Sequence, residues 1–219
     1  MRKYNLKDKF KCSWLDPYCV NTCILPAIDK VEANPDFLCS HPPKEHLFLP
    51  FSIIDEFPRL IIMGQDPYPD SRATGLAFEV KKPGMDKSRS SLRTLSYSLG
   101  VKDGWFDVRK WAKDNAILLV NASPSCSTQK ASRSKQYIAW RPFWNAVLRP
   151  LLGSRPIVVL TFGKKASALF ENFRPQLGDR LLVRAHPASR KSKCQKMQKS
   201  DWLDISNKAK IKLPVESLA

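Results

Sequence analysis

The sequence predicts an α/β fold of three layers, an α/β/α sandwich around a central, four-stranded and mostly parallel sheet. Two observations support this prediction. Four short runs rich in Ile, Val and Leu are typical of strands buried on both faces. Longer segments with helical spacing separate these runs, and strands that alternate with helices indicate a parallel sheet.

The predicted elements follow one another along a single domain, residues 1–219. Residues 1–50 are rich in Pro, Cys and aromatic residues, so we expect short helices and loops that pack on the core. The predicted strands are Arg59–Met63, Ala116–Val120, Pro156–Phe162 and Leu181–Ala185. The predicted helices include Ser91–Leu99, Gln136–Leu152 and Lys164–Phe173. Since no internal repeat or Gly/Ser linker divides the chain, only residues 213–219 are expected to form a weakly ordered tail.

Charge points to a polyanionic partner. The 219 residues include 37 Lys and Arg against 20 Asp and Glu, a formal net charge of +17. Such an excess attracts nucleic acid, because neutralised phosphates release their counterions. Residues 115–170 and 180–200 contain no Asp or Glu, which favours a continuous basic face over a generally basic, solubilising surface.

Membrane insertion and secretion are not expected. No apolar segment approaches the roughly 18 residues that cross a bilayer, and Met1–Lys11 lacks the hydrophobic region of a signal peptide. We therefore expect an intracellular protein, of the nucleus or cytoplasm, with a viral source compatible with both. Its six cysteines would then be mostly reduced thiols.

Four cysteines near the N-terminus raise the alternative of a zinc or iron–sulfur site. Together with two histidines they are Cys12, Cys19, Cys23, Cys39, His41 and His46. Their spacing is irregular and contains no Cys-x-x-Cys pair, whereas structural zinc sites usually show tight paired spacing. We therefore expect no metal.

Polar residues follow each predicted strand: Gly64-Gln65-Asp66, then Asn121, then Gly163-Lys164, and then His186. The carboxyl ends of parallel strands meet at one edge of the sheet, where ligands bind. A carboxylate there can activate water or stabilise an oxocarbenium-like sugar, an amide can read a base edge, and a neutral imidazole can donate to a leaving base. The alternatives are an ordinary turn at Asp66 and a solvated or structural His186.

Four motifs, in order and spacing, resemble those of family 1 uracil-DNA glycosylases. They are Gly64–Pro69 (GQDPYP), Ala73–Phe78 (ATGLAF), Leu118–Ala122 (LLVNA) and His186–Arg190 (HPASR). The resemblance covers about residues 55 to 205. It implies the glycosylase fold and a monofunctional repair enzyme that flips uracil out of DNA and hydrolyses its N-glycosidic bond, leaving an abasic site. It also implies that no metal or organic cofactor is needed.

The resemblance assigns two catalytic residues and four that bind the base. Asp66 corresponds to the carboxylate that activates water and stabilises the sugar cation, and His186 to the imidazole that hydrogen-bonds uracil O2. The base-binding residues are Asn121, which reads the N3 and O4 edge, Tyr68, which blocks a C5 methyl group, Phe78, on which uracil stacks, and Gln65, in the backbone stretch that contacts the base.

Five further residues correspond to the family's DNA-gripping loops. Ser90 and Ser91 stand at the Pro-rich loop, Lys164 at the Gly-Ser loop, and Ser189 and Arg190 in the loop after the catalytic histidine. Small residues let backbone amides approach a phosphate, and cations add charge.

Two departures mark this chain as atypical. Pro69 stands where the family has His, and Arg190 where it has an intercalating Leu. Both resemble the poxviral branch of the family. A guanidinium can occupy the vacated base stack, since it is planar.

The implied substrate is uracil-containing single- or double-stranded DNA, bound by a monomer with no membrane partner. A replication protein or a proteinaceous inhibitor is a further partner class. Two alternatives stay open: a DNA-binding replication accessory or processivity protein with little catalysis, and a related glycosylase of broader mismatch specificity, which the Tyr68 ring disfavours.

Overall fold

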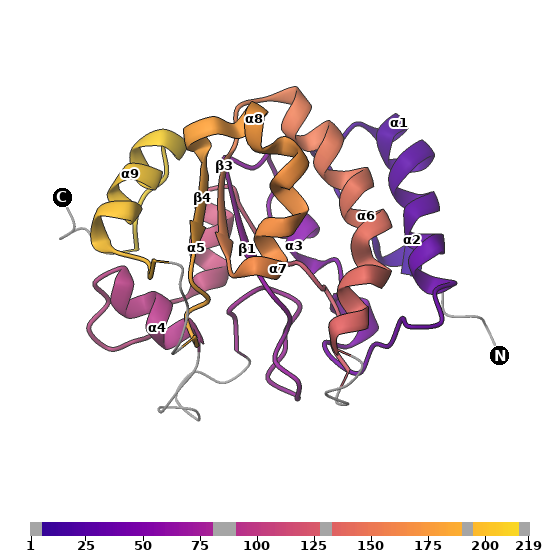
Figure 1. Cartoon of the computed structure of the whole chain (residues 1–219), viewed down its shortest axis with the longest axis horizontal. Helices are drawn as coiled ribbons and strands as arrows, with labels where there is room; N and C mark the ends of the chain where they lie inside the picture. Colours follow the sequence, from indigo (N-terminus) through magenta and orange to yellow (C-terminus); the bar gives the residue numbers. More distant parts are fainter. Residues whose placement is uncertain (1–5, 81–90, 128–132, 190–194, 215–219) are drawn as a thin grey trace.

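The computed structural model describes residues 6–80, 91–127, 133–189 and 195–214 (Figure 1). At its centre is a sheet of four parallel strands in the order β2-β1-β3-β4. The strands are β1 (Leu60–Gly64), β2 (Ile117–Asn121), β3 (Val158–Phe162) and β4 (Leu181–Arg184). The four-stranded α/β prediction is confirmed, and the sheet is wholly rather than mostly parallel.

The strands are apolar because helices cover both faces of the sheet. Every residue of β1, β2 and β3 is buried, whereas β4, also predicted to be buried on both faces, is half-buried because it is an edge strand. Alternate side chains enter different cores: Ile61 and Met63 belong to one, and Leu60 and Ile62 to the other. This alternation follows from the two-residue period of a strand.

Two groups of helices form the outer layers (Figure 1). The first group packs on the face of the sheet that carries Ile61, and other parts of residues 6–54 pack there too. The second group packs on the face that carries Leu60. The first comprises α2 (Leu25–Glu32), α3 (Leu49–Ser52), α6 (Arg133–Ser154), α7 (Lys164–Ser167) and α8 (Arg174–Leu177), with α1 (Pro17–Cys19) leading into α2; the second comprises α4 (Ser91–Ser98), α5 (Val108–Asp114) and α9 (Lys199–Ala209).

The chain reverses direction across the sheet at β1. It crosses from β1 to β2 through α4 and α5, then returns past β1 to β3 through α6. Right-handed crossovers in opposite directions put their helices on opposite faces. The ends of β1 and its neighbours therefore form a switch point, the usual ligand site of open α/β sheets.

Two predicted helices differ in extent from those observed. The helix predicted over Gln136–Leu152 is longer, Arg133–Ser154, and its Trp140, Phe143 and Trp144 fill the core at helical spacing. The helix predicted over Lys164–Phe173 is divided: α7 ends at Ser167, and a 3-10 helix continues over Ala168–Phe173. The Ser167 hydroxyl donates to the Lys164 carbonyl at 3.1 Å, a local bond that competes with regular α-helical pairing.

The described part of the chain bears on two other expectations. None of its helices is long and apolar enough to cross a membrane. Within the same residues no group of three His, Cys, Asp or Glu side chains could hold a metal ion, and Cys12, Cys19, Cys23, Cys39 and Cys126 are free thiols. Burial raises the pKa of Cys39 to about 12 and that of Cys12 to about 11.

Of the predicted tail, residues 215–219 lie outside the description, while Leu213 packs on the core of α5 and α9.

Candidate functional site

The carboxyl edge of the sheet holds a cavity of about 160 Å³. It brings together the three polar residues that were predicted to converge from different strand ends. Its lining residues are Asp66, Pro67, Tyr68, Pro69, Ala73, Leu76, Phe78, Ser91, Asn121 and His186. We call it the first cavity.

Backbone pairing beyond the strands fixes Asn121 against β1. Gly64 is the register partner of Asn121, the Ala122 N–H donates to the Gly64 carbonyl at 3.0 Å, and the Ser123 N–H donates to the Gln65 carbonyl at 2.9 Å. A Cβ on Gly64 would lie 2.5 Å from Asn121 Oδ1 and 3.3 Å from Phe78 Cζ. Only glycine therefore lets the amide and the aromatic ring approach each other across this strand end, a role that the sequence pattern does not reveal.

Phe78 occupies an unusual backbone conformation at the wall of the first cavity. Its φ is 68°, a region that bulky residues rarely adopt. Its ring, 6% exposed, meets the Phe162 ring edge-on at a centroid distance of 5.4 Å. A non-glycine residue held at positive φ carries strain of about 1–3 kcal/mol, and such strain clusters at functional sites. Phe78 thus belongs to the core on this face of the sheet and also lines the first cavity.

The N-terminal segment braces the loop before Phe78. Gly75, at a φ of 104°, packs directly on the His46 carbonyl. His41 pairs with Cys126 through backbone hydrogen bonds, and the Cys126 thiol donates to the Tyr68 carbonyl at 3.4 Å. Residues 41–46 thus support the cavity walls, although the sequence carried little functional signal there.

Tyr68 lies beneath an arginine that sequence reasoning did not single out. The Arg72 guanidinium is 5.0 Å from the centroid of the Tyr68 ring, within cation–π range. Arg72 also donates to Asp70 through two nitrogens, Nε at 2.9 Å and Nη2 at 2.7 Å. These bonds hold the pKa of Asp70 below its usual range. The available signal was the Asp-x-Arg spacing directly after the first motif.

His186 follows β4 and faces the first cavity in its neutral form. Burial lowers the pKa of His186, while the nearby charge of Asp66 opposes this shift. Its Nδ1 accepts from the Ala188 N–H at 3.3 Å, and its carbonyl accepts from the Ser189 N–H at 2.8 Å. Because Nδ1 acts as the acceptor, the proton of the neutral ring is on Nε2, which is therefore a donor.

Of the remaining predicted site residues that the structure describes, Ser91 alone lines the first cavity. Ser91 is the first residue of α4. Gln65 is half-buried, and its side chain packs against Gly163, whose φ is 87°. Lys164 is exposed at the start of α7, and Ser189 is half-buried. Ser90 and Arg190 lie outside the described residues.

The first cavity combines a carboxylate, an amide, a neutral imidazole and an aromatic wall. An amide offers one donor and one acceptor group, and Nε2 of the imidazole offers a donor. Such a set suits a flat, polar ring that presents both kinds of hydrogen-bonding edge. The Asp66 carboxylate is positioned to stabilise positive charge next to that ring.

Comparison with known proteins gives a consistent result. The family model of the Uracil DNA glycosylase superfamily matches residues 51–209. A uracil-DNA glycosylase from a Ruegeria species is 34% identical over 139 residues, which cover 61% of this chain and 57% of the relative. One from Streptococcus equi subsp. zooepidemicus is 31% identical over 142 residues, 60% of this chain and 63% of the relative. The match thus spans less than two thirds of the length of these two relatives.

A longer match and a solved structure extend the comparison. A uracil-DNA glycosylase from Coxiella burnetii is 30% identical over 159 residues, 68% of this chain and 67% of the relative. The crystal structure of a wild-type UNG from Nitratifractor salsuginis superposes with a TM-score of 0.54 at 18% identity, covering 86% of this chain and 90% of that one. At that identity the superposition establishes the fold.

Proposed function

Because the chain belongs to the Uracil DNA glycosylase superfamily, we propose that it removes uracil from DNA by hydrolysing the N-glycosidic bond, which leaves an abasic site. The observation that carries this proposal is the meeting of Asp66, Asn121 and His186 in the first cavity, beside the Phe78 ring. The four motifs favour family 1, and Pro69 and Arg190 favour its poxviral branch.

In the proposed reaction the bond between uracil N1 and the sugar C1′ breaks, and its electron pair leaves with the base. Water then adds to C1′ and transfers a proton to the Asp66 carboxylate. Asp66 stabilises the oxocarbenium-like sugar and orients the water, as carboxylates do in glycoside hydrolysis. Support comes from its position after β1, next to His186, whose pKa it influences.

His186 is proposed to stabilise the leaving uracil anion. Its Nε2–H would donate to uracil O2 as negative charge develops there. The lowered pKa and the Nδ1 hydrogen bond both support a neutral ring with the proton on Nε2.

Base selection is proposed to depend on three residues. Asn121 would read the N3 and O4 edge and so reject cytosine, Tyr68 would block a C5 methyl group and so reject thymine, and Phe78 would stack on the base. The base must leave the duplex to reach them, which costs a few kcal/mol of stacking. Gln65 would contribute backbone contacts.

The DNA grip is proposed to come from five residues in the loops that the family resemblance assigns to phosphate contacts. Ser90, Ser91, Lys164, Ser189 and Arg190 would contact phosphates or the vacated stack, as their positions in the motifs indicate. Such contacts set register rather than base choice. A replication protein or a proteinaceous inhibitor is the proposed further partner class.

An excision assay tests the proposal. Single-stranded, U·A and U·G oligonucleotides are incubated with the protein and then cleaved with alkali; the absence of abasic sites from all three would contradict it. We expect Asp66→Asn and His186→Leu each to lose about a hundredfold to a thousandfold in rate while still binding DNA. Asp204→Asn, half-exposed on α9, is the control and should excise at the wild-type rate.

The net charge of +17 favours the second candidate, a DNA-binding replication accessory with little catalysis. Tight binding of uracil-free DNA without excision would identify this function. The chemistry gathered around the first cavity argues for the enzyme, since a binding module needs no neutral histidine beside a carboxylate.

A further inference from the structure

A second cavity, of about 260 Å³, lies on the other side of His186. It runs between α4, the ends of β3 and β4, and the segment that returns to α9. Its described lining residues are Thr94, Leu95, Tyr97, Ser98, Phe162, Ala185, His186, Pro187, Lys196 and Met197. The proposed reaction does not use this cavity.

The two cavities are neighbours in the fold. His186 lines both of them. Helix α4 also borders both, because Ser91 in its first turn faces the first cavity and Thr94 and Tyr97 face the second. The edge-on pair of Phe78 and Phe162 contributes one ring to each cavity. Anything held in the second cavity is therefore within one side chain of the base proposed for the first.

The walls of the second cavity suit a flat, partly polar ring. Apolar surface comes from Phe162, Pro187 and Met197. Tyr97 adds a ring that is 48% exposed, an unusual degree for so large an apolar surface on a helix that packs on the core. Exposed aromatic rings beside a groove are what proteins use to stack bases without reading their sequence.

The Tyr97 ring is held in place. The Arg93 guanidinium lies 5.4 Å from its centroid, and Arg93 Nε donates to Tyr97 Oη at 2.9 Å. Gly104, at a φ of 68°, permits this arrangement, since a Cβ there would lie 2.9 Å from Arg93 Cγ and 3.1 Å from Tyr97 Cζ. A fixed ring loses less conformational entropy when a ligand stacks on it.

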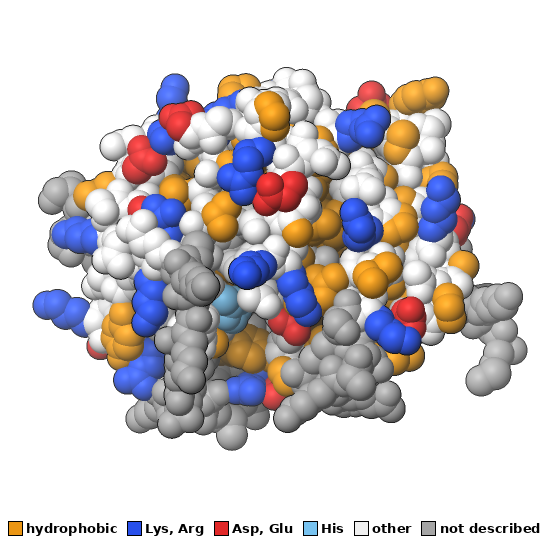
Figure 2. Space-filling view, viewed as in Figure 1, with side chains coloured by type: hydrophobic (Ala, Val, Ile, Leu, Met, Phe, Trp, Pro, Cys, Tyr) orange, Lys and Arg blue, Asp and Glu red, His pale blue; other side chains and the backbone are white. Residues whose placement is uncertain are grey.

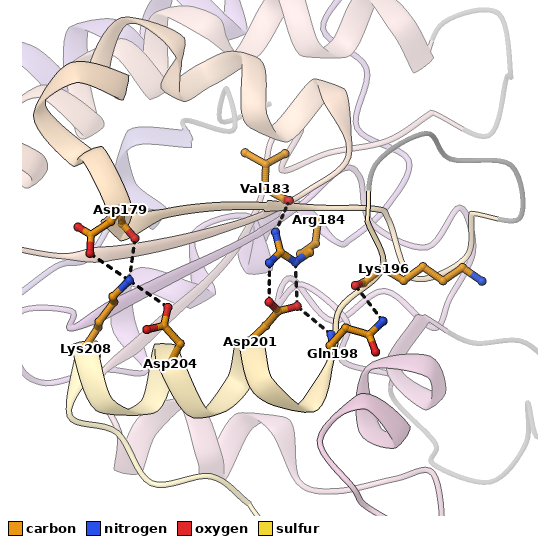
Figure 3. Close-up of polar contacts among 8 residues, drawn as sticks. All are labelled: Asp179, Val183, Arg184, Lys196, Gln198, Asp201, Asp204 and Lys208. Atoms are coloured by element: carbon orange, nitrogen blue, oxygen red, sulfur yellow. Dashed lines mark hydrogen bonds and ion pairs between the residues drawn. The ribbon is translucent and has the colours of Figure 1, made fainter.

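Charge around the second cavity favours an anionic ligand. Lys196 is the one charged residue of its described lining other than the titratable His186. Figure 3 shows that the Lys196 side chain extends away from the Arg184–Asp201 ion pair, and within the described chain no ion pair holds its ammonium. Arg93 adds a second cation beside Tyr97, so two cations border the described part of this groove.

We propose that the second cavity binds the base of the nucleotide next to the flipped uracil on the same strand, with Tyr97 as its stacking surface and Lys196 near its phosphate. The inference rests on the proposed function. Neighbouring nucleotides share one phosphodiester linkage, so the base next to a flipped uracil can reach a cavity that only one imidazole separates from the first.

The test removes the neighbouring base but keeps its phosphate. Single-stranded oligonucleotides carry uracil with a normal base on both sides, or with a tetrahydrofuran abasic analogue at the 5′ or the 3′ neighbour. KM and kcat are measured for wild type, Tyr97→Ala and, as matched control, Tyr18→Ala, whose ring is 72% exposed near the N-terminus. Circular dichroism melting verifies that each variant is folded.

We expect loss of one neighbouring base to raise the wild-type KM about tenfold, because a stacked base is worth roughly 1–3 kcal/mol. Tyr97→Ala should show the raised KM on the intact oligonucleotide and no further rise on the abasic one, with kcat unchanged. Tyr18→Ala should match wild type. The proposal would be overturned if Tyr97→Ala raised KM equally on the intact oligonucleotide and on the abasic one, or if it changed KM on neither.

Two further measurements separate this proposal from its premise and from other occupants. If no uracil is excised from any substrate, the proposed function fails, but fluorescence anisotropy of the same oligonucleotides still reports whether Tyr97 senses the neighbouring base. Free uracil is added as an inhibitor of excision or as a competitor in anisotropy. If Tyr97→Ala weakens its effect, the cavity takes the released base instead, and the proposal is wrong.

Discussion

At the residue scale, Gly64 determines how closely the amide and the aromatic ring of the first cavity approach each other. We predict that Gly64→Ala lowers kcat/KM for uracil excision at least tenfold, because its Cβ would lie 2.5 Å from Asn121 Oδ1 and displace the amide. A misplacement of about 1 Å can cost a hundredfold in rate. Steady-state excision kinetics measure the loss.

Gly153→Ala is the matched control for that substitution. Gly153 is in α6, and its Cβ would meet nothing within 4 Å. We expect unchanged excision and a gain of about 0.5–1 kcal/mol in unfolding free energy, as for other helical glycines. Full activity in Gly64→Ala would show that Asn121 does not need its observed position.

The contact between Arg72 and Tyr68 predicts that both residues affect the preference for uracil over thymine. Tyr68→Ala should gain thymine excision, because it removes the cavity-lining ring that we propose excludes a C5 methyl group. Arg72→Ala leaves the ring but removes its cation–π partner, so we predict a smaller gain of the same kind. The measurement is the ratio of kcat/KM for uracil and thymine. If Tyr68→Ala excises no thymine, the steric assignment of Tyr68 is wrong. If Tyr68→Ala excises thymine but Arg72→Ala keeps the wild-type ratio, Arg72 does not position the ring.

The ionisation of His186 predicts the acid side of the pH profile. Because burial lowers its pKa, excision should stay on its plateau as the pH falls through about 6.5, the ordinary pKa of histidine, and decline only below it. Removing the opposing charge in Asp66→Asn should lower the pKa of His186 further. NMR titration of the imidazole protons, assigned with His186→Leu, measures the pKa of His186 in the wild type and in Asp66→Asn. Titration at or above the ordinary value would contradict the neutral role.

Strand-end residues could be predicted from sequence because each directly follows an apolar run. Asp66, Asn121 and His186 all reached one cavity as expected. The role of Gly64 could not be assigned, because it depends on where a missing Cβ lies relative to Asn121, a residue distant in the sequence. The role of Arg72 could not be assigned either, because the path of its turn decides that the guanidinium covers the Tyr68 ring. Such contacts have no periodic signature.

At the scale of elements, the Arg184–Asp201 pair joins the end of β4 to the first turn of α9 (Figure 3). Arg184 Nε donates to Asp201 Oδ2 at 2.8 Å, and the same carboxylate caps α9 by accepting from the Gln198 N–H. The side chains are only 14% and 11% exposed. We predict that Asp201→Asn lowers the unfolding free energy by about 3 kcal/mol, since it removes the carboxylate that compensates the charge of a mostly buried guanidinium.

Denaturant unfolding of Asp201→Asn against Asp204→Asn tests this prediction. Lys208 binds Asp204 on the same helix and Asp179 in the turn before β4, and these two acids are 52% and 80% exposed. Asp204→Asn should therefore cost less than about 1 kcal/mol. Equal losses in the two variants would contradict the prediction.

The same ion pair has a definite pH dependence. The Arg184 hydrogen bonds lower the pKa of Asp201 in the folded protein. The contribution of this ion pair to the unfolding free energy is therefore complete above the pKa of Asp201 in the unfolded chain, near 3.9. It is lost as the pH falls through the lower pKa of Asp201 in the folded protein. The difference in unfolding free energy between wild type and Asp201→Asn should be constant above about pH 5 and shrink below about pH 4.

The strands were easier to predict than the N-terminal segment for a physical reason. Buried parallel strands must be continuously apolar, which marks β1, β2 and β3 in the sequence. Residues 6–54 instead enter the core from short elements, as Leu6, Phe10 and Phe51 do, and the longest of these elements, α2, has only eight residues. Their support for the first cavity came only from the structure.

At the scale of the whole molecule, lysine and arginine side chains spread over the face shown in Figure 2, around a histidine at the surface. With a net charge of +17, DNA affinity should depend steeply on salt. For about four phosphate contacts, raising salt from 50 to 200 mM should weaken duplex binding about a hundredfold, and single-strand binding less, since its slope per phosphate is smaller.

The salt slope of single variants then identifies the basic residues that contact phosphate. Lys164 is exposed at the start of α7, at the same edge of the sheet as the first cavity. Lys164→Ala should reduce the slope of log K against log salt by about one. Lys110 is the control: it pairs with Asp114 at 2.7 Å on α5, which leads to the opposite edge of the sheet, so Lys110→Ala should leave the slope unchanged. Both variants lose one positive charge, so net charge alone predicts equal effects. Fluorescence anisotropy at several salt concentrations therefore separates a localised grip from a generally basic surface, and equal slopes for the two variants would rule out the localised grip at Lys164.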